Sequence, residues 1–116
     1  MDIPEYTRLK NNRDFGLVFR RGQYYPGRHV VLHANRSGAA QLRLGVAVSR
    51  KVRGAVLRNR LKRRLREAFR RLDVLLPNGY DLILTAKATA AKAPFDELQN
   101  EIKGLLARSK LLVHGR

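Results

Sequence analysis

Residues 42–72, LRLGVAVSRKVRGAVLRNRLKRRLREAFRRL, join two hydrophobic patterns and decide the fold. In residues 42–49, apolar side chains alternate with Arg, Gly, Ala and Ser, as in a half-buried strand. In residues 56–72, apolar side chains fall at helical spacing and cover about 120° of a helical wheel. The sequence therefore predicts a strand that leads directly into an amphipathic helix.

Segments on both sides predict two further helices and two further long strands. A helix is expected at 12–22 with Asn12 as its N-cap, and a last helix begins at Pro94. Strands are expected at 28–35 and 80–86, and the second is apolar enough to be buried on both faces. Tyr24 and Tyr25 are expected to add a short strand, which gives the order α-β-β-β-α-β-α.

Length and composition indicate one domain, residues 1–116, with flexible ends at 1–8 and 110–116. A chain of 116 residues buries roughly 60–70% of its unfolded surface, enough for a modest core. The chain has no cysteine, which excludes disulfides, thiolate metal sites and a cysteine nucleophile. No apolar run reaches the ~18–20 residues that span a bilayer, and we expect a cytoplasmic protein.

The positive charge is concentrated in one segment. The net charge is +16, from 25 Lys and Arg against 9 Asp and Glu, and residues 50–71 hold 11 of the basic residues beside one acid, Glu67. Like charges at i,i+4 on a helix repel by about a few tenths of a kcal/mol per pair, so the basic face indicates a polyanionic partner. The excess of Arg over Lys favours bidentate contacts with phosphate.

Residues with the spacing of a catalytic site are scarce. His29 and His33 have the HxxxH spacing of a metal pair, but four residues on a strand separate them by about 13 Å, too far to share an ion. Asp96 and Glu97 are interpreted as first-turn helix electrostatics, and Glu101 as part of a solvated face. On spacing alone we expect that the protein is not itself a catalyst.

The basic helix and its neighbours closely resemble the bacterial ribonuclease P protein component. The core of the match is Arg58-Asn59-Arg60, the family's RNR motif, followed by Leu61-Lys62-Arg63 and Arg66-Glu67-Ala68-Phe69. LKNNRDF at 9–15 resembles the family's opening helix, and YDLIL at 80–84 resembles the strand after the basic helix. The resemblance spans nearly the whole chain.

This resemblance implies an α+β fold, an α/β sandwich like domain 2 of ribosomal protein S5. It also implies a left-handed β-α-β crossover through the basic helix, against the usual right-handed rule. The implied function is to assist a catalytic RNA that removes the 5′ leader from precursor tRNA. The RNA would supply the active site and Mg²⁺, the protein alone would be inactive, and the protein would bind no cofactor. The implied partners are the catalytic RNA and precursor tRNA, with no membrane or protein partner evident.

The resemblance also implies two sets of site residues. Binding of the catalytic RNA is expected at Arg50, Lys51, Arg58, Asn59, Arg60, Lys62, Arg63 and Arg66. The cleft for the 5′ leader is expected at Phe15, Phe19, Val31 and His33, where His33 stands at a position that is often aromatic in the family.

The residues alone also favour such a cleft. Gly45, Ala47 and Ser49 leave one face of their strand short of side chains, and His29, Val31 and His33 share one face of the neighbouring strand. If both faces lie on the same side of the sheet, they form a shallow floor beside the first helix. The sequence leaves open whether Phe15 and Phe19 are stacking rings or core residues that hold this helix.

Two other functions compete with a ribonuclease P subunit. A ribosomal or RNA-chaperone module could carry the same basic helix, and only restored cleavage of precursor tRNA by a ribonuclease P RNA at low magnesium separates the two. A helix-turn-helix DNA-binding protein expects a short helix before the recognition helix. Here the predicted strand 42–49 occupies that place.

Overall fold

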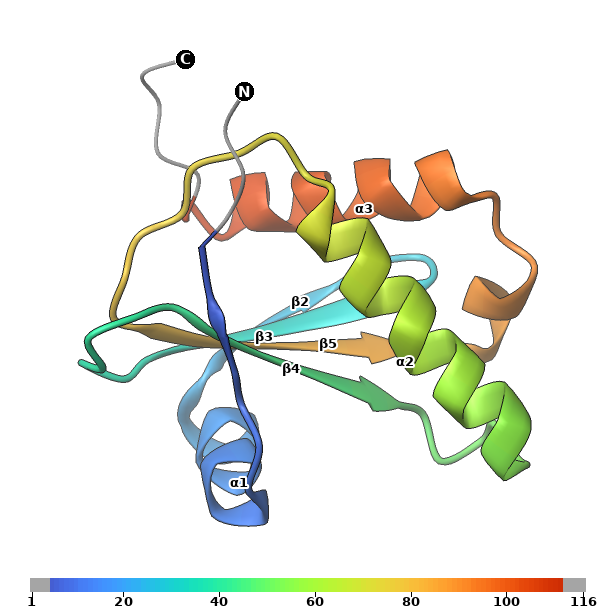
Figure 1. Cartoon of the computed structure of the whole chain (residues 1–116), viewed down its shortest axis with the longest axis horizontal. Helices are drawn as coiled ribbons and strands as arrows, with labels where there is room; N and C mark the ends of the chain where they lie inside the picture. The colour runs from blue at the N-terminus through green and yellow to red at the C-terminus, as the bar shows by residue number, and fades with distance from the viewer. Residues whose placement is uncertain (1–4, 112–116) are drawn as a thin grey trace.

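Helices cover both faces of a five-stranded sheet in the part of the chain that the structure, a computed structural model, describes, residues 5–111 (Figure 1). The elements are β1 (Thr7–Arg8), α1 (Asn12–Arg21), β2 (Gln23–Pro26), β3 (Val30–Arg36), β4 (Arg43–Val48), α2 (Ala55–Arg70), β5 (Tyr80–Ala86), the 3₁₀ helix η1 (Ala88–Ala91) and α3 (Phe95–Arg108). The strand order is β1-β4-β5-β3-β2. The predicted α+β class is confirmed, and the short strand at Tyr24 and Tyr25 forms as part of β2.

The centre of the sheet is a β-α-β unit. β4 and β5 are parallel neighbours, with Leu44 opposite Leu82 and Val46 opposite Leu84, and α2 connects them. β3 pairs antiparallel with β5 on one side and with β2 on the other. The left-handed sense of the crossover and the likeness to ribosomal protein S5 stay predictions.

The main core lies between the sheet and the helices α2 and α3. Leu44, Val46 and Val48 alternate along β4 as predicted and point into this core. They meet the buried stripe of α2, in which Leu65 and Phe69 are fully buried. Burying one such side chain stabilises the fold by about 1.5–3 kcal/mol, so the stripe fixes which face of α2 is left for solvent.

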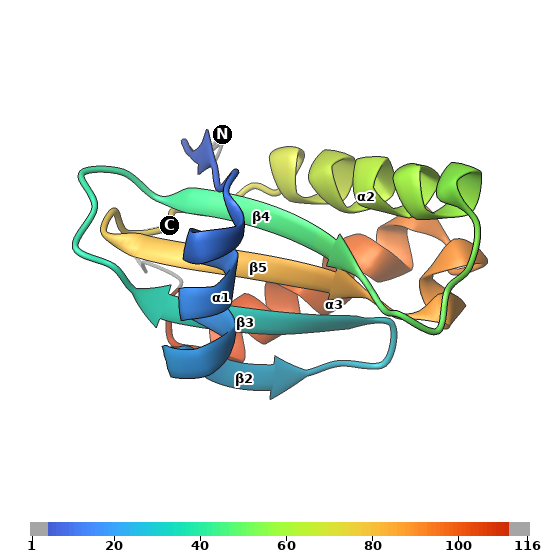
Figure 2. The same ribbon diagram turned by 90° about the horizontal axis from the view of Figure 1, so that it is seen from below.

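A smaller core lies on the other face, where α1 crosses the strands (Figure 2). Val18 of α1 and Ile83 of β5 are fully buried there and pack with Leu9. β5 is therefore buried on both faces, as its continuous apolar sequence predicts. The N-cap of α1 is Asn11 rather than the predicted Asn12, since Asn11 Oδ1 accepts the Asp14 N–H at 2.8 Å.

Two elements have no counterpart in the sequence prediction, β1 and η1. β1 pairs with the first residues of β4, and Thr7 N–H donates to the Leu42 carbonyl at 2.9 Å. It lies in the segment 1–8 that we expected to be flexible, whereas residues 1–4 and 112–116 lie outside the described part of the chain. A strand of two residues is too short to show a hydrophobic period, so only pairing across the sheet reveals it.

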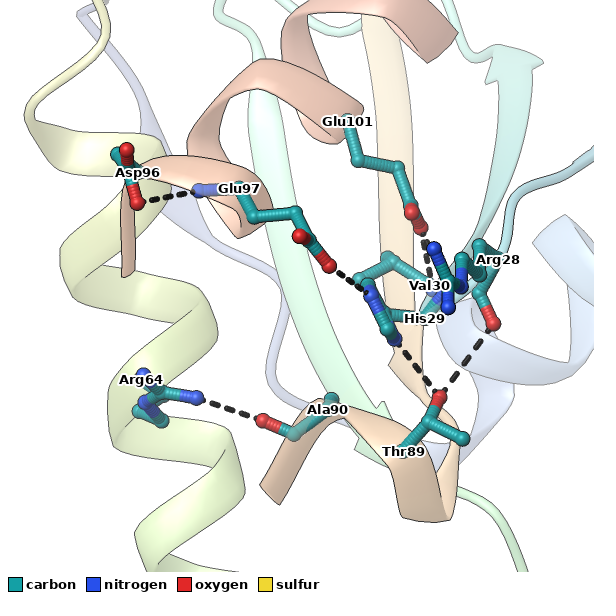
Figure 3. A network of polar contacts seen from close by, with 9 residues as sticks. All are labelled: Arg28, His29, Val30, Arg64, Thr89, Ala90, Asp96, Glu97 and Glu101. Carbon is teal, nitrogen blue, oxygen red and sulfur yellow. Dashed lines mark hydrogen bonds and ion pairs between the residues drawn. The ribbon is translucent and has the colours of Figure 1, made fainter. Parts of the chain in front are cut away.

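The contacts of His29 show that two sequence predictions, one for His29 and one for Glu101, are wrong. His29 precedes β3, and its ring turns toward η1 and α3, where Nδ1 lies 2.8 Å from Thr89 Oγ1 and Nε2 contacts Glu97 (Figure 3). It therefore does not share the face of Val31 and His33 as predicted. Glu101 is not on a freely solvated face either, because its Oε2 accepts the N–H groups of His29 and Val30 at 2.8 and 2.7 Å. These bonds fix the start of β3 against α3.

Candidate nucleic-acid interface

An open groove of about 640 Å³ follows the edge of β4 between α1 and α2. Because β1 pairs only with Arg43 and Leu44, the rest of this edge is uncovered, and residues Leu44 to Val48 form the floor. Five cationic residues from three segments line the groove, and none of its lining residues is Asp or Glu: Arg8, Lys10, Arg58, Lys62 and Arg66. The groove is therefore positively charged and open to solvent.

Phe15 forms the aromatic wall of the groove nearest to the sheet. Its ring packs over Gly45 so closely that a Cβ on that glycine would lie 2.5 Å from Phe15 Cζ. Phe15 also packs against the small core around Ile83 and Val18, so it is half core and half groove wall. Gly45 was expected to form part of a shallow floor beside the first helix, and the Phe15 ring lies directly over it.

Phe19 is the exposed ring of the pair. It lies one helical turn beyond Phe15, with ring centroids 6.4 Å apart, and is 44% exposed. The rings of Phe19 and His33 are nearly perpendicular, with centroids 4.9 Å apart. Tyr24, which is 60% exposed, lies on the paired strand with its ring centroid 5.3 Å from that of His33. Phe19, His33 and Tyr24 thus form an aromatic ledge beside the groove. The sequence left open whether these two rings stack on bases or belong to the core. Each ring takes one of the two roles: Phe15 packs in the core, and Phe19 is available for stacking.

His33 and Val31 lie on the floor beside α1, outside the groove itself. Burial lowers the pKa of the His33 imidazole from 6.5, which favours the neutral ring at neutral pH. Val31 is 8% exposed and can offer only a small apolar surface. Tyr24 is the aromatic member that the sequence analysis missed. Its position opposite His33 in the β2–β3 pair could have indicated it.

The basic wall of the groove is one row of side chains on α2. Arg58, Lys62 and Arg66 follow each other at intervals of four residues and flank the apolar stripe. Partial burial and the nearby guanidinium of Arg8 lower the pKa of the Arg66 guanidinium. Like charges are therefore held close together here, and an anion between them would relieve their repulsion. Arg8 and Lys10 are not among the predicted site residues, because both precede α1 and lie outside the basic segment.

Arg58 has a structural role in addition to its place in the groove. Its Nη1 donates to the carbonyls of Ser49 and Val52 at 2.8 and 2.9 Å, and its Nη2 donates to the Val48 carbonyl at 3.1 Å. These bonds join the first turn of α2 to the end of β4 and to the loop between them. Much of the donor capacity of Arg58 is therefore used inside the protein.

The other predicted residues of the basic helix point away from the groove. Asn59, Arg60 and Arg63 are exposed on the outer face of α2, and Arg50 and Lys51 are exposed in the preceding loop. The eight residues predicted to bind the catalytic RNA thus divide into a groove row of three and an outer surface of five. The two predicted surfaces are adjacent, because the groove row also lies opposite Phe15 and Phe19.

A polar network that is centred on Arg43 links the first turn of α1 to the sheet. Arg43 donates from Nε and Nη2 to the two oxygens of buried Asp81, at 2.7 and 2.6 Å, and from Nη1 to Asp14 of α1 at 3.3 Å. The bond to Asp81 raises the pKa of the Arg43 guanidinium above its usual value. This bridge fixes the first turn of α1, and with it the position of Phe15.

The geometry suits an extended single strand of nucleic acid. Exposed rings can stack on bases, while a parallel row of Arg and Lys can contact phosphates along the same strand. Within residues 5–111 no three His, Cys, Asp or Glu side chains lie close enough to hold a metal ion. Over the same residues, no helix is long and apolar enough to cross a membrane.

Comparison with known proteins shows what this chain resembles. The sequence model of a family described as Ribonuclease P matches residues 3–110. Two similar proteins named ribonuclease P protein component come from Pelotomaculum thermopropionicum and Natranaerobius thermophilus. They are 39% and 40% identical, over 89% and 95% of this chain and 92% and 96% of their own.

Solved structures of the same kind share the fold. The RNase P protein of Staphylococcus aureus superposes with a TM-score of 0.76 at 28% identity and covers 94% of this chain and 100% of its own. The RNase P protein of Thermotoga maritima gives a TM-score of 0.75 at 31% identity, with 93% and 98% covered. The resemblance stated from the RNR motif is therefore confirmed.

Proposed function

The chain belongs to the ribonuclease P protein family, and we propose that it binds both RNAs of the holoenzyme, the catalytic RNA and the 5′ leader of precursor tRNA. The family name makes it the protein component of an endoribonuclease that processes tRNA. The observation that carries the proposal is one groove with aromatic rings on one wall and a row of cations on the other.

The outer face of α2 is the proposed contact with the catalytic RNA. A structured RNA presents mainly phosphates and 2′-hydroxyl groups, which suit exposed Arg and Lys side chains. Arg60 and Arg63 are exposed there, and neither carries a bond inside the described part of the protein that binding would break. Each phosphate contact that is lost should reduce the log–log salt slope by about 0.9.

The aromatic ledge and the groove are the proposed contact with the 5′ leader. Single-stranded bases expose their faces, and Phe19 with His33 and Tyr24 offers ring surfaces beside the groove. Arg66 and Lys62 lie where they can neutralise phosphates of the same strand. The proposed catalytic RNA would supply the active site and its Mg²⁺, and the protein would position the substrate.

Reconstitution tests this function. We expect the protein to restore cleavage of precursor tRNA by a ribonuclease P RNA at low magnesium, and to cleave nothing without that RNA. The double variant Arg60→Ala/Arg63→Ala should keep its fold and bind the catalytic RNA with a lower salt slope. Absence of stimulation by the wild-type protein would favour a general RNA-binding module instead. Cleavage by RNA-free protein would contradict the proposal that the RNA supplies the active site and the protein only positions the substrate.

A further inference from the structure

A second groove lies at the other edge of the sheet, where β2, the end of β3 and the end of α3 meet. Its volume is about 410 Å³. Three cations from separate parts of the chain line it: Arg21 from the last turn of α1, Arg36 from the end of β3, and Lys110 after α3. The rings of Tyr25 and Tyr80, both half-buried, form part of its wall.

This groove carries positive charge that no residue among 5–111 neutralises. None of its lining residues is Asp or Glu. In residues 5–111 the Arg side chains that pair with carboxylates are Arg43, Arg70 and Arg71, and neither Arg21 nor Arg36 has an ion pair. Positive charges gathered in a concave site raise the local concentration of anions.

Helix electrostatics explain only part of this arrangement. Arg21 is the last residue of α1 and Lys110 follows the end of α3, and cations at such positions interact favourably with the helix dipole. Arg36 is on a strand, so the dipole does not account for it. Lys110 also adopts a left-handed backbone with φ 62°, a position at which Gly or Asn is usual after a helix. The chain thus keeps a cation where the backbone favours a different residue.

We propose that this second groove binds the phosphodiester backbone of an RNA strand. Phosphate oxygens accept hydrogen bonds from guanidinium, ammonium and tyrosine hydroxyl groups, and all three are present at the groove. β4 and β2 are three strand spacings apart, about 14 Å, so one phosphate cannot reach both grooves. The protein would therefore hold RNA at two separate places. This inference rests on the proposed function, which supplies the RNA.

The test removes two charges from the groove and two from elsewhere. Arg21→Ala/Arg36→Ala is compared with Arg28→Ala/Lys103→Ala, whose residues are exposed and do not line either groove. The affinities for the catalytic RNA alone, and of the holoenzyme for precursor tRNA, are measured over a series of salt concentrations. We expect the groove variant to lower the salt slope for one of these RNAs by about 1.4–1.8 units, the value for two lost phosphate contacts, and the control by less than half of that.

The outcomes separate the inference from the function on which it rests. If the wild-type protein binds and stimulates the catalytic RNA but the two variants have the same slopes, the second groove is not an RNA site. A larger loss of affinity for polyglutamate than for RNA would assign the groove to an acidic protein segment and overturn the proposal. If the Ala variant is unfolded by circular dichroism, Arg21→Gln/Arg36→Gln keeps the side-chain length and gives the same test.

Discussion

Replacing Gly45 by Ala tests whether Phe15 is seated on β4 as the structure describes. The added methyl group would lie 2.5 Å from Phe15 Cζ and 3.0 and 3.1 Å from the two neighbouring ring carbons. Real side-chain atoms do not approach so closely, so the Phe15 ring must move away from the sheet. Its other contacts, in the small core with Val18 and Ile83, resist this movement.

The expected effect is a loss of stability of about 1–3 kcal/mol, the usual cost of an extra methyl group in a packed site. In a domain of this size that corresponds to a fall in Tm of about 4 °C per kcal/mol. The sign of the stability change is informative. Gly45 is not among the glycines with positive φ, so its backbone does not itself disfavour Ala. Without the Phe15 contact, Ala at this position would stabilise the protein by about 0.4–1 kcal/mol.

The assay is urea unfolding of Gly45→Ala, Phe15→Ala and the double variant. The penalty of Gly45→Ala should disappear in the Phe15→Ala background, because the ring that clashes with the methyl group is gone. Gly104→Ala is the control, since a Cβ at Gly104 in α3 meets nothing within 4 Å and should stabilise the helix by about 0.5–1 kcal/mol. A stable Gly45→Ala protein, or an equal penalty in both backgrounds, would refute the seating of Phe15.

Three further predictions concern the groups around the groove. Arg58→Ala should lower the free energy of unfolding by about 1–3 kcal/mol, because three carbonyls lose a charged donor. The control Arg60→Ala should change the free energy of unfolding by less than about 0.5 kcal/mol. Equal values for the two variants would contradict the structural role of Arg58. Asp81→Asn should lower the free energy of unfolding, measured with heat or urea, by about 1–3 kcal/mol. The loss is smaller than for a fully buried ion pair because the Arg43 side chain is 30% exposed. An unchanged stability would show that the Arg43–Asp81 bridge does not stabilise the fold. The pKa of His33 is lowered by burial, so the unfolded chain takes up a proton first, and stability should fall as pH drops below about 6.5. Unfolding curves of His33→Phe and wild type should therefore diverge below that pH and run parallel above it, and a constant difference would contradict the assignment.

Much of the fold could be predicted because its long elements carry clear hydrophobic periods. Leu65 and Phe69 lie on the buried stripe of α2 that the helical spacing indicates, and β4 alternates as its sequence predicts. β1 could not be predicted in this way, since Thr7 and Arg8 are held by backbone bonds to a strand 36 positions later. A pairing of that kind leaves no local pattern in two residues.

The candidate site could be predicted in content but not in arrangement. The RNR motif identified the family and the basic helix, and Phe15 and Phe19 are on α1 as expected. The sequence does not show that Arg58 turns back to carbonyls of its own loop, or that His29 turns toward α3. The groove itself arises because α1 and α2 cover opposite faces and both reach the edge of β4. That meeting depends on packing between residues far apart in the chain.

The ratio of holoenzyme affinities for precursor and mature tRNA, measured for Phe19→Ala, tests the central claim most directly. Phe19 lines the groove and is 44% exposed, so its loss should leave the fold intact and remove a stacking surface. A stacked base is worth about 1–3 kcal/mol, which predicts precursor binding about 5- to 150-fold weaker, with mature tRNA almost unchanged. Val56→Ala, at an exposed apolar residue outside the groove, should leave both affinities unchanged. An unaltered ratio in Phe19→Ala, or an equal loss for both tRNAs, would contradict the claim that this groove receives the 5′ leader.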